Sequence, residues 1–267
     1  MIKNTPLVSV ITVVYNGEKY IEDVIRSVLN QTYNNIEYII IDGGSSDNTI
    51  SIIKKYEHQI AFWVSENDKG ISDAFNKGIA KATGEIIGII NSDDWYETDA
   101  VAKIVANSND ADIIYGDMQL WNNNKKDFIV KGDHHFLTRE MTVNHPTVFV
   151  RKDCYNTLGL FDTQYKLAMD YDLMLRFAVN KCRFIYIPEV LSNMRWEGLS
   201  DLNWLTGCRE TLQIKNKYLP KRKILNQLYF YKHVFAITLS KLIRKTRTEF
   251  LVKTYRSRYS KVKKIYE

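Results

Sequence analysis

Buried strands and amphipathic helices alternate along the first hundred residues, and this order constrains the fold more than any other feature of the sequence. Four short runs rich in Ile and Val predict buried strands, at residues 7–14, 36–41, 60–64 and 86–90. Apolar side chains recur at helical spacing between them, at residues 18–29, 50–56 and 71–82. We therefore expect an α/β fold with an open, mainly parallel central sheet and helices on both faces.

The later part of the sequence is less regular. Short strands are expected at residues 112–120, 128–131, 147–150 and 183–187. Pro188 is predicted to end the last of these strands. A short helix is expected at 152–158, and residues 193–200 are expected to form a loop. His134 and His135 should face solvent, and from Asn203 onward the chain should be helical, with a break at Pro220.

Polar turns follow three of the predicted parallel strands, at residues 12–16, 42–45 and 91–94. Because ligands bind outside the carboxyl ends of strands in such sheets, these turns are the first candidate site. In the third turn, the neighbouring carboxylates of Asp93 and Asp94 repel each other unless a cation, a proton or hydrogen-bond donors lie near. One reading is Mg²⁺ or Mn²⁺ held by Asp93, since both ions prefer oxygen ligands. The alternative is a plain turn in which either aspartate caps the next helix.

Two further carboxylates, Asp170 and Asp172, stand at the start of a predicted helix. Either could cap that helix, and one could act as a general base if it reaches an acceptor hydroxyl. Side chains two positions apart lie on different sides of a helix, so only one of the pair should face a cleft. Asp170 is closer to the preceding loop. His145, which precedes Pro146, is a candidate cleft donor, metal ligand or buried imidazole.

Charge is distributed unevenly along the chain. Residues 215–267 contain 16 Lys and Arg but only two Glu, a net charge of +14, which leaves −8 on residues 1–214. Several apolar residues of this tail can share one helical face, namely Leu225, Leu228, Phe235, Leu239 and Leu242. A basic amphipathic helix suits an anionic membrane surface, and a solvated face packed on the body is the alternative. Nucleic acid is not an expected partner.

Features of the termini and cysteines bear on localisation. The N-terminus lacks the basic start and long apolar core of a secretory signal, and no run of about 18 apolar residues occurs. The three cysteines form no C-x-x-C pair, which favours free thiols in a reducing compartment. Together with the basic tail, these features predict a cytoplasmic protein, peripheral to a membrane.

Taken in order, the motifs resemble those of the family 2 glycosyltransferases, inverting sugar-nucleotide enzymes with the GT-A fold. Residues 8–16 are similar to the opening strand and nucleotide-binding turn, and residues 41–49, IDGGSSDNT, to the base- and ribose-binding turn. Residues 65–78, SENDKGISDAFNKG, are similar to a segment of enzymes that build colanic acid, O-antigens and capsules. Residues 91–94 occupy the place of the metal-binding D-x-D motif, with Asn91 in the first position. His145-Pro146 and the motif MDYD at 169–172 follow in the expected order.

The resemblance implies a role for each part of the site. Asp170 matches the family's catalytic base, with Asp172 as the alternative. Asp93, helped by Asp94, would hold Mn²⁺ or Mg²⁺ on the donor diphosphate. Nucleotide contacts are implied for Thr12, Val14, Tyr15, Asn16, Asp42, Gly43, Ser45, Asp68, Lys69, Asn76, Asn91 and Ser92. Acceptor or diphosphate contacts are implied for Trp95, His145, Arg195 and Ser200.

The resemblance also implies a function. The chain would transfer a sugar from a nucleotide sugar, with UDP favoured, to a polyprenyl-diphosphate-linked glycan at the inner face of a bacterial membrane, in surface polysaccharide biosynthesis. Residues 1–205 would form the GT-A domain, with a nucleotide-binding half at 1–95 and an acceptor-binding half at 96–205. Residues 206–267 would form a basic, amphipathic helical extension. The alternatives are a nucleotidyltransferase or a non-catalytic sugar-nucleotide-binding module.

Overall fold

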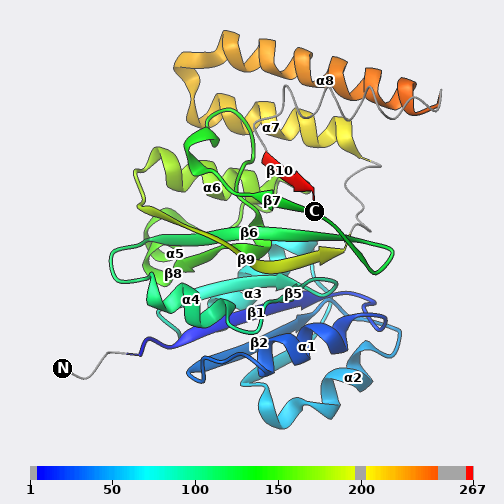
Figure 1. Cartoon of the computed structure of the whole chain (residues 1–267), viewed down its shortest axis with the longest axis vertical. Coiled ribbons are helices and arrows are strands. Elements are labelled where there is room, and N and C mark those ends of the chain that lie inside the picture. The colour runs from blue at the N-terminus through cyan, green and yellow to red at the C-terminus, as the bar shows by residue number, and fades with distance from the viewer. Residues whose placement is uncertain (1–4, 196–202, 246–262, 267) are drawn as a thin grey trace.

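The computed structural model describes residues 5–195, 203–245 and 263–266, and it confirms the predicted α/β architecture (Figure 1). Four parallel strands form the first part of the sheet, in the order β4-β1-β2-β3. They are β1 (Val8–Val14), β2 (Ile36–Asp42), β3 (Phe62–Ser65) and β4 (Ile86–Asn91). Because these strands are parallel, the polar turns that follow them lie at the same edge of the sheet.

Helices cover both faces of these strands (Figure 1). Those of the first part are α1 (Ile21–Leu29), α2 (Thr49–Lys55), α3 (Ile71–Lys81) and α4 (Ala100–Ala106). Ile11 and Val13 of β1 pack in one core with α3, whereas Val10 and Val14 pack in the other core with α1 and α4. Both faces of β1 are therefore buried, which explains its nearly continuous apolar sequence.

The second part extends the sheet beyond β4 with mixed pairing. Its strands are β5 (Trp95–Tyr96), β6 (Ile113–Asn122), β7 (Lys125–Lys131), β8 (Phe149–Arg151) and β9 (Phe184–Arg195). β8 is antiparallel to both β4 and β6, while β9 is parallel to β6. The helices α5 (Lys152–Leu158) and α6 (Met169–Val179) join the core that contains α3. Short 3-10 turns occur at Glu57–Gln59, His134–Phe136 and His145–Thr147.

Two local predictions were wrong. β9 does not end at Pro188 but continues to Arg195, because the strand is irregular there: Ile187 lies opposite Gly116, and Val190 opposite the next residue of β6. This bulge accommodates a residue that has no backbone N–H to donate. His134 does not face solvent either, since its ring stacks on Phe184 with centroids 5.1 Å apart.

The helical prediction for the C-terminal part is confirmed up to residue 245. α7 (Trp204–Tyr218) and α8 (Lys223–Lys245) are separated by a 3-10 turn at Pro220–Arg222. The prediction is wrong for Lys263–Tyr266, which form strand β10, antiparallel to β7 (Figure 1). Lys263–Tyr266 form a strand because the edge of β7 has backbone groups with which they can pair. Within the described ranges, no helix is long and apolar enough to cross a membrane.

We expect two glycine-to-alanine substitutions to act in opposite directions. A Cβ at Gly88 in β4 would overlap the ring of Phe149, so Gly88→Ala should lower the free energy of unfolding by about 1–3 kcal/mol. A Cβ at Gly207 in α7 would lie 3.8 Å from Leu167, an ordinary contact, so Gly207→Ala should raise it by roughly 0.5–1 kcal/mol. Urea unfolding followed by circular dichroism measures both. A neutral Gly88→Ala would contradict the packing of β4 against β8.

Candidate functional site

The turns after β1 and β2 are joined by hydrogen bonds. The backbone N–H of Asn16 donates to Ser45 Oγ at 2.7 Å, and Asn16 Oδ1 accepts from the backbone N–H of Ser46 at 2.9 Å. Asn16 has a left-handed backbone conformation, with φ of 49°, which asparagine tolerates better than most residues. Tyr15 beside it is 66% exposed, so most of its ring is accessible to a planar ligand.

The Asp42 carboxylate organises the second turn from within. It accepts hydrogen bonds from the backbone N–H groups of Gly44 and Ser45, at 3.1 and 2.9 Å, and from the hydroxyls of Ser45 and Ser65. The side chain has no exposed surface. The structure therefore gives Asp42 the role of shaping the turn, in place of the direct base contact that the sequence implied.

The loop before α3 lies directly against this turn. A side chain at Gly43 would place its Cβ 2.5 Å from Asp68 Oδ2, and one at Gly44, where φ is 85°, would place it 2.5 Å from Asn67 Oδ1. At Gly44 the left-handed backbone also favours glycine, whereas a side chain at Gly43 would have to displace the Asp68 carboxylate. Asp68 Oδ1 also accepts from the N–H of Gly70 at 2.8 Å, where α3 begins. Asp68 and the exposed Lys69 thus lie beside the second turn, as their predicted roles require.

Two predicted nucleotide contacts lie inside the fold and are corrected. Thr12 has no exposed surface, and its hydroxyl pairs with that of Tyr38 at 3.0 Å. Val14 is 4% exposed, and its carbonyl accepts from the second turn at 2.8 Å. Asn76 is half-buried, and its amide donates to the carbonyl and accepts from the N–H of Phe161, both at 2.9 Å, so its nucleotide contact stays a prediction.

The turn after β4 holds oxygen atoms that lack protein partners. Asp94 is 1% exposed, and neither its Oδ1 nor Asn91 Oδ1 has a hydrogen-bond partner among the described residues. Burial, followed by the charge of Asp93, raises the pKa of Asp94 well above its usual range. The turn after β4 also lies close to the turn after β1, since a Cβ added at Gly17 would lie 3.4 Å from Ser92 Oγ.

This oxygen-rich turn fits a divalent cation. Half-buried Asp93 stands beside the two unpartnered oxygens, and a cation would relieve the repulsion between the adjacent carboxylates. No cluster of three or more His, Cys, Asp or Glu side chains that could hold a metal occurs in the part of the chain that the structure describes. The protein would thus supply only part of the ligand sphere, which is usual for ions that keep water and phosphate ligands.

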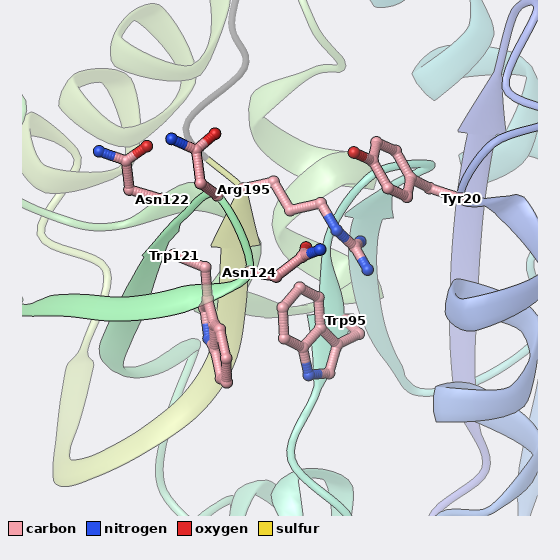
Figure 2. A pocket seen from close by; sticks show the side chains of 7 residues that line it. Tyr20, Trp95, Trp121, Asn122, Asn124 and Arg195 are labelled. Carbon is pink, nitrogen blue, oxygen red and sulfur yellow. The ribbon is translucent and has the colours of Figure 1, made fainter.

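A small aromatic pocket adjoins the acidic turn (Figure 2). The Arg195 guanidinium, at the end of β9, lies between the rings of Tyr20 and Trp95, 4.1 and 4.4 Å from their centroids. It donates to the Asp93 carbonyl at 2.6 Å and to Asp23 Oδ2 at 2.7 Å. Both terminal nitrogens are therefore engaged, and Arg195 fixes the acidic turn against α1. These two bonds use two of the five N–H donors of the guanidinium, so the predicted diphosphate contact of Arg195 stays a prediction.

The rest of this pocket comes from the β6–β7 hairpin, at Trp121, Asn122, Asn123 and Asn124. The Trp121 ring centroid lies 5.4 Å from that of Trp95, and its Nε1 donates to Asn193 Oδ1 at 2.7 Å. Aromatic faces beside a few polar amides are typical of ligand pockets, which supports Trp95 as an acceptor contact. Ser200 lies outside the described residues.

The two candidate bases have different surroundings. Asp170 is partly exposed, its Oδ1 accepts from the Tyr171 N–H at 2.7 Å, and burial raises its pKa to about 6. Asp172 has no exposed surface and forms ion pairs with Arg176 at 2.8 Å and Lys217 at 3.4 Å. Asp172 is thus held in ion pairs, and it is not the predicted cap, because α6 has no side-chain cap hydrogen bond. Of the two carboxylates, Asp170 is the one with exposed surface.

His145 is half-buried, and its imidazole lies among aromatic side chains. Its ring lies 5.5 Å from that of Phe75 and 5.7 Å from that of Phe161, between centroids. Burial lowers the pKa of His145 to about 4, so the ring is neutral at pH 7. A neutral imidazole still has one N–H donor and one nitrogen acceptor, so the predicted acceptor or diphosphate contact of His145 stays a prediction.

The sequence analysis missed two residues of the site region. Trp121 was not predicted as a site residue because a lone tryptophan in a strand usually packs in the hydrophobic core. Glu210 of α7 was overlooked because it lies on a helix assigned to a separate extension, yet its carboxylate accepts from three backbone N–H groups just before α6. The role of Glu210 follows only from the contact between α7 and the loop that precedes α6. No sequence motif predicts that contact.

Comparisons with known proteins agree with this architecture. The sequence model of Glycosyl transferase family 2 matches residues 9–172, and the chain belongs to this family. A Rickettsia typhi glycosyltransferase described as uncharacterized is 32% identical over 188 residues, which make up 65% of this chain and 59% of that protein. The chain thus spans less than two thirds of that relative. A PGL/p-HBAD biosynthesis glycosyltransferase of Mycobacterium tuberculosis is 27% identical over 208 residues. The alignment covers 73% of this chain and 80% of that protein.

Solved structures of low identity share the GT-A fold. The mannosyltransferase PcManGT of Pyrobaculum calidifontis, solved with GDP-Man and Mn²⁺, aligns with a TM-score of 0.65 at 18% identity, covering 96% of this chain and 83% of that chain. TarS of S. aureus, solved with UDP-GlcNAc, aligns with a TM-score of 0.62 at 17% identity, covering 85% and 71%. The predicted fold class is confirmed.

We expect Asp170→Asn to stabilise the protein in a pH-dependent manner. Folding raises the pKa of Asp170 from about 3.9 to about 6, so the folded state binds the proton more tightly than the unfolded state. As pH rises from about 3.9 to about 6, the ionising carboxyl therefore lowers the free energy of unfolding. The substitution should raise the free energy of unfolding by about 1–2 kcal/mol at pH 7, after allowance for partial exposure, and by little at pH 4. Urea unfolding at both pH values measures this difference.

Asp172→Asn is the matched comparison. It leaves Arg176, whose side chain is 13% exposed, without its carboxylate partner, so the free energy of unfolding at pH 7 should fall by about 3 kcal/mol. Equal effects of the two substitutions would contradict the different roles given to the two aspartates.

Proposed function

We propose that the chain is an inverting glycosyltransferase that moves a sugar from a nucleoside-diphosphate donor, with UDP-sugars favoured, to a hydroxyl group of a lipid-linked glycan. Asp170 carries this proposal. In a chain of this family it is a partly exposed carboxylate whose pKa of about 6 suits proton transfer near neutral pH. The relatives solved with UDP, UDP-GlcNAc or GDP-Man support the donor class.

In the proposed reaction, the acceptor hydroxyl gives its proton to Asp170 as its oxygen attacks the anomeric carbon of the donor sugar. The bond from that carbon to the diphosphate oxygen breaks, and the nucleoside diphosphate leaves with the electron pair. The Tyr171 N–H orients the carboxylate through Oδ1. A single in-line displacement inverts the anomeric carbon, and one base is sufficient for it.

The donor would lie against the three turns. Tyr15 offers an accessible ring to the base. The remaining proposed contacts come from the turns and from the loop before α3, at Asn16, Gly43, Ser45, Asp68, Lys69, Asn91 and Ser92. Mn²⁺ or Mg²⁺, held by Asp93 with Asp94 and Asn91, would neutralise charge on the leaving diphosphate. The relative solved with GDP-Man and Mn²⁺ supports this metal class.

A donor screen followed by two substitutions tests the proposal. We expect one sugar among UDP-, GDP- and dTDP-sugars to raise Tm in the presence of Mn²⁺ and to be transferred to a bacterial extract of lipid-linked glycan. Asp170→Asn should lower kcat on the order of 10²- to 10⁴-fold while the donor still raises Tm. Asp93→Asn should reduce the Mn²⁺-dependent part of the Tm shift.

Asp99→Asn is the control, because Asp99 forms a surface ion pair with Lys103 at 3.0 Å and lies outside the site. It should leave both transfer and the Tm shift unchanged. Near-native transfer by both Asp170→Asn and Asp93→Asn would show that the proposed mechanism is wrong.

We also propose that α8 lies on the anionic inner face of a bacterial membrane, where a polyprenyl-diphosphate-linked acceptor for surface polysaccharide would be available. Figure 1 shows α8 at the outside of the molecule, with α7 between it and the sheet. Apolar side chains that are 41–78% exposed recur along it, at Ile224, Leu225, Leu228, Tyr231, Phe235 and Leu239. Exposed basic side chains adjoin this apolar stripe, at Lys221, Arg222, Lys223 and Lys232.

The stripe has the composition of an interfacial helix. From Leu225 onward its members are three or four residues apart, so they share one face, and the basic side chains suit anionic lipid headgroups. Four of the five residues predicted for this face are exposed on it, and the side chain of Leu242 lies outside the described residues. The helix would lie in the plane of the membrane surface.

Vesicle binding tests this orientation. Leu228→Asn with Phe235→Asn keeps the net charge and should weaken binding to vesicles of phosphatidylcholine and phosphatidylglycerol at least about tenfold, because less apolar surface enters the interface. Co-sedimentation measures the bound fraction. Leu160→Asn, which changes a 38% exposed leucine away from α8, should not alter it. Equal binding by all three proteins would exclude α8 as the lipid-facing element.

A further inference from the structure

We propose that Glu210 of α7 is a positioning residue for Asp170, so that the helical C-terminal part forms a component of the catalytic site. Glu210 Oε1 accepts from the Lys166 N–H at 3.0 Å, and Oε2 accepts from those of Leu167 and Ala168, both at 2.9 Å. The carboxylate is 8% exposed. A single buried side chain thus holds three consecutive amides, the last of them two residues before Asp170. The inference rests on the proposed role of Asp170 as the base.

Within the described part of the chain, Glu210 is the acceptor of all three amides. Ala168 is the N-cap residue of α6 and carries no side chain that could cap the helix. Its N–H is the buried one of the three, and an unpaired buried N–H costs about 1–3 kcal/mol, so this group in particular requires an acceptor. Glu210 supplies it from a different helix, 42 residues further along the chain. Hydrogen bonds of this charged kind are roughly twice as strong as neutral ones, which makes the loop conformation depend on this carboxylate.

Glu210 also acts on Asp170 through its charge. Burial is the main cause of the raised pKa of Asp170, the N–H of Tyr171 opposes it, and the negative charge of Glu210 adds to it. The other charged groups nearby are arranged as a separate network, in which Asp172 pairs with Arg176 and Lys217. Glu210 is therefore the ionised neighbour that favours proton uptake by the base.

α7 is anchored firmly enough to serve this purpose. Ile214 is fully buried in a small core with Tyr171 and Leu175 of α6. One turn of helix from Glu210, the ammonium of Lys215 donates to the Arg139 carbonyl at 2.9 Å. These contacts hold the part of α7 that follows Glu210 against α6 and against the Arg139 carbonyl, so the carboxylate is placed by packing.

Glu210→Gln tests the inference, because it keeps the side-chain length but removes the charge and one acceptor oxygen. The pKa of Asp170, followed by NMR of protein carrying ¹³C-labelled aspartate and assigned with Asp170→Asn, should fall by roughly 0.5 or more. With the donor found in the screen, kcat should fall about tenfold at unchanged donor KM, and the acidic limb of the kcat–pH profile should move to lower pH. Glu210→Asp, which keeps the charge but shortens the reach, should lose kcat while the pKa of Asp170 stays raised.

Asp162→Asn is the matched control. It removes another carboxylate from the α6–α7 junction, where Asp162 pairs with Lys217 at 3.1 Å, but leaves the amides before α6 untouched. It should not move the pKa of Asp170. A wild-type pKa and kcat in whichever Glu210 variant folds would overturn the inference. Because the NMR titration needs no substrate, that result is distinct from failure of the proposed function, which would show as near-native transfer by Asp170→Asn.

Discussion

The parallel pairing of β1 with both β2 and β4 is the constraint on which the site depends. Each of these strands ends in a polar turn, and the shared register places the three turns at one edge. The turns are then fixed to one another by short-range contacts, such as the bond from the Asn16 N–H to Ser45 Oγ. Most of the polar atoms near the strand ends hold the backbone in position, and only a minority remain for a ligand.

Most of the fold was predictable because its signals are local. Continuous apolar runs identified β1, β2 and β4, and the break at Pro220 was placed correctly. The failures have non-local causes. β9 continues past Pro188 because the neighbouring strand tolerates a bulge, and the segment Lys263–Tyr266 is a strand because β7 has an edge to pair with. Neither condition can be read from the residues that it affects.

The site was predictable at the level of turns and less so at the level of side chains. Position after a strand identified the turns that contain Asp42 and Asp93, but it could not distinguish a residue that meets a ligand from one that shapes the backbone. Asp42 and Asp172 illustrate this limit, since hydrogen bonds and ion pairs from distant residues occupy their carboxylates. The choice between Asp170 and Asp172 required the position of α7, which no short motif specifies.

The pairing of β10 with β7 has a consequence for the solubility of the molecule. An exposed, regular strand edge is a template on which another chain can pair and begin to aggregate. Lys263–Tyr266 cover that edge of β7 opposite Phe128–Lys131, with β7 itself lying next to β6. The last described segment of the chain thus covers an edge of β7 that would otherwise have unpaired backbone groups. Removing it would expose a strand edge at which two copies of the chain could associate.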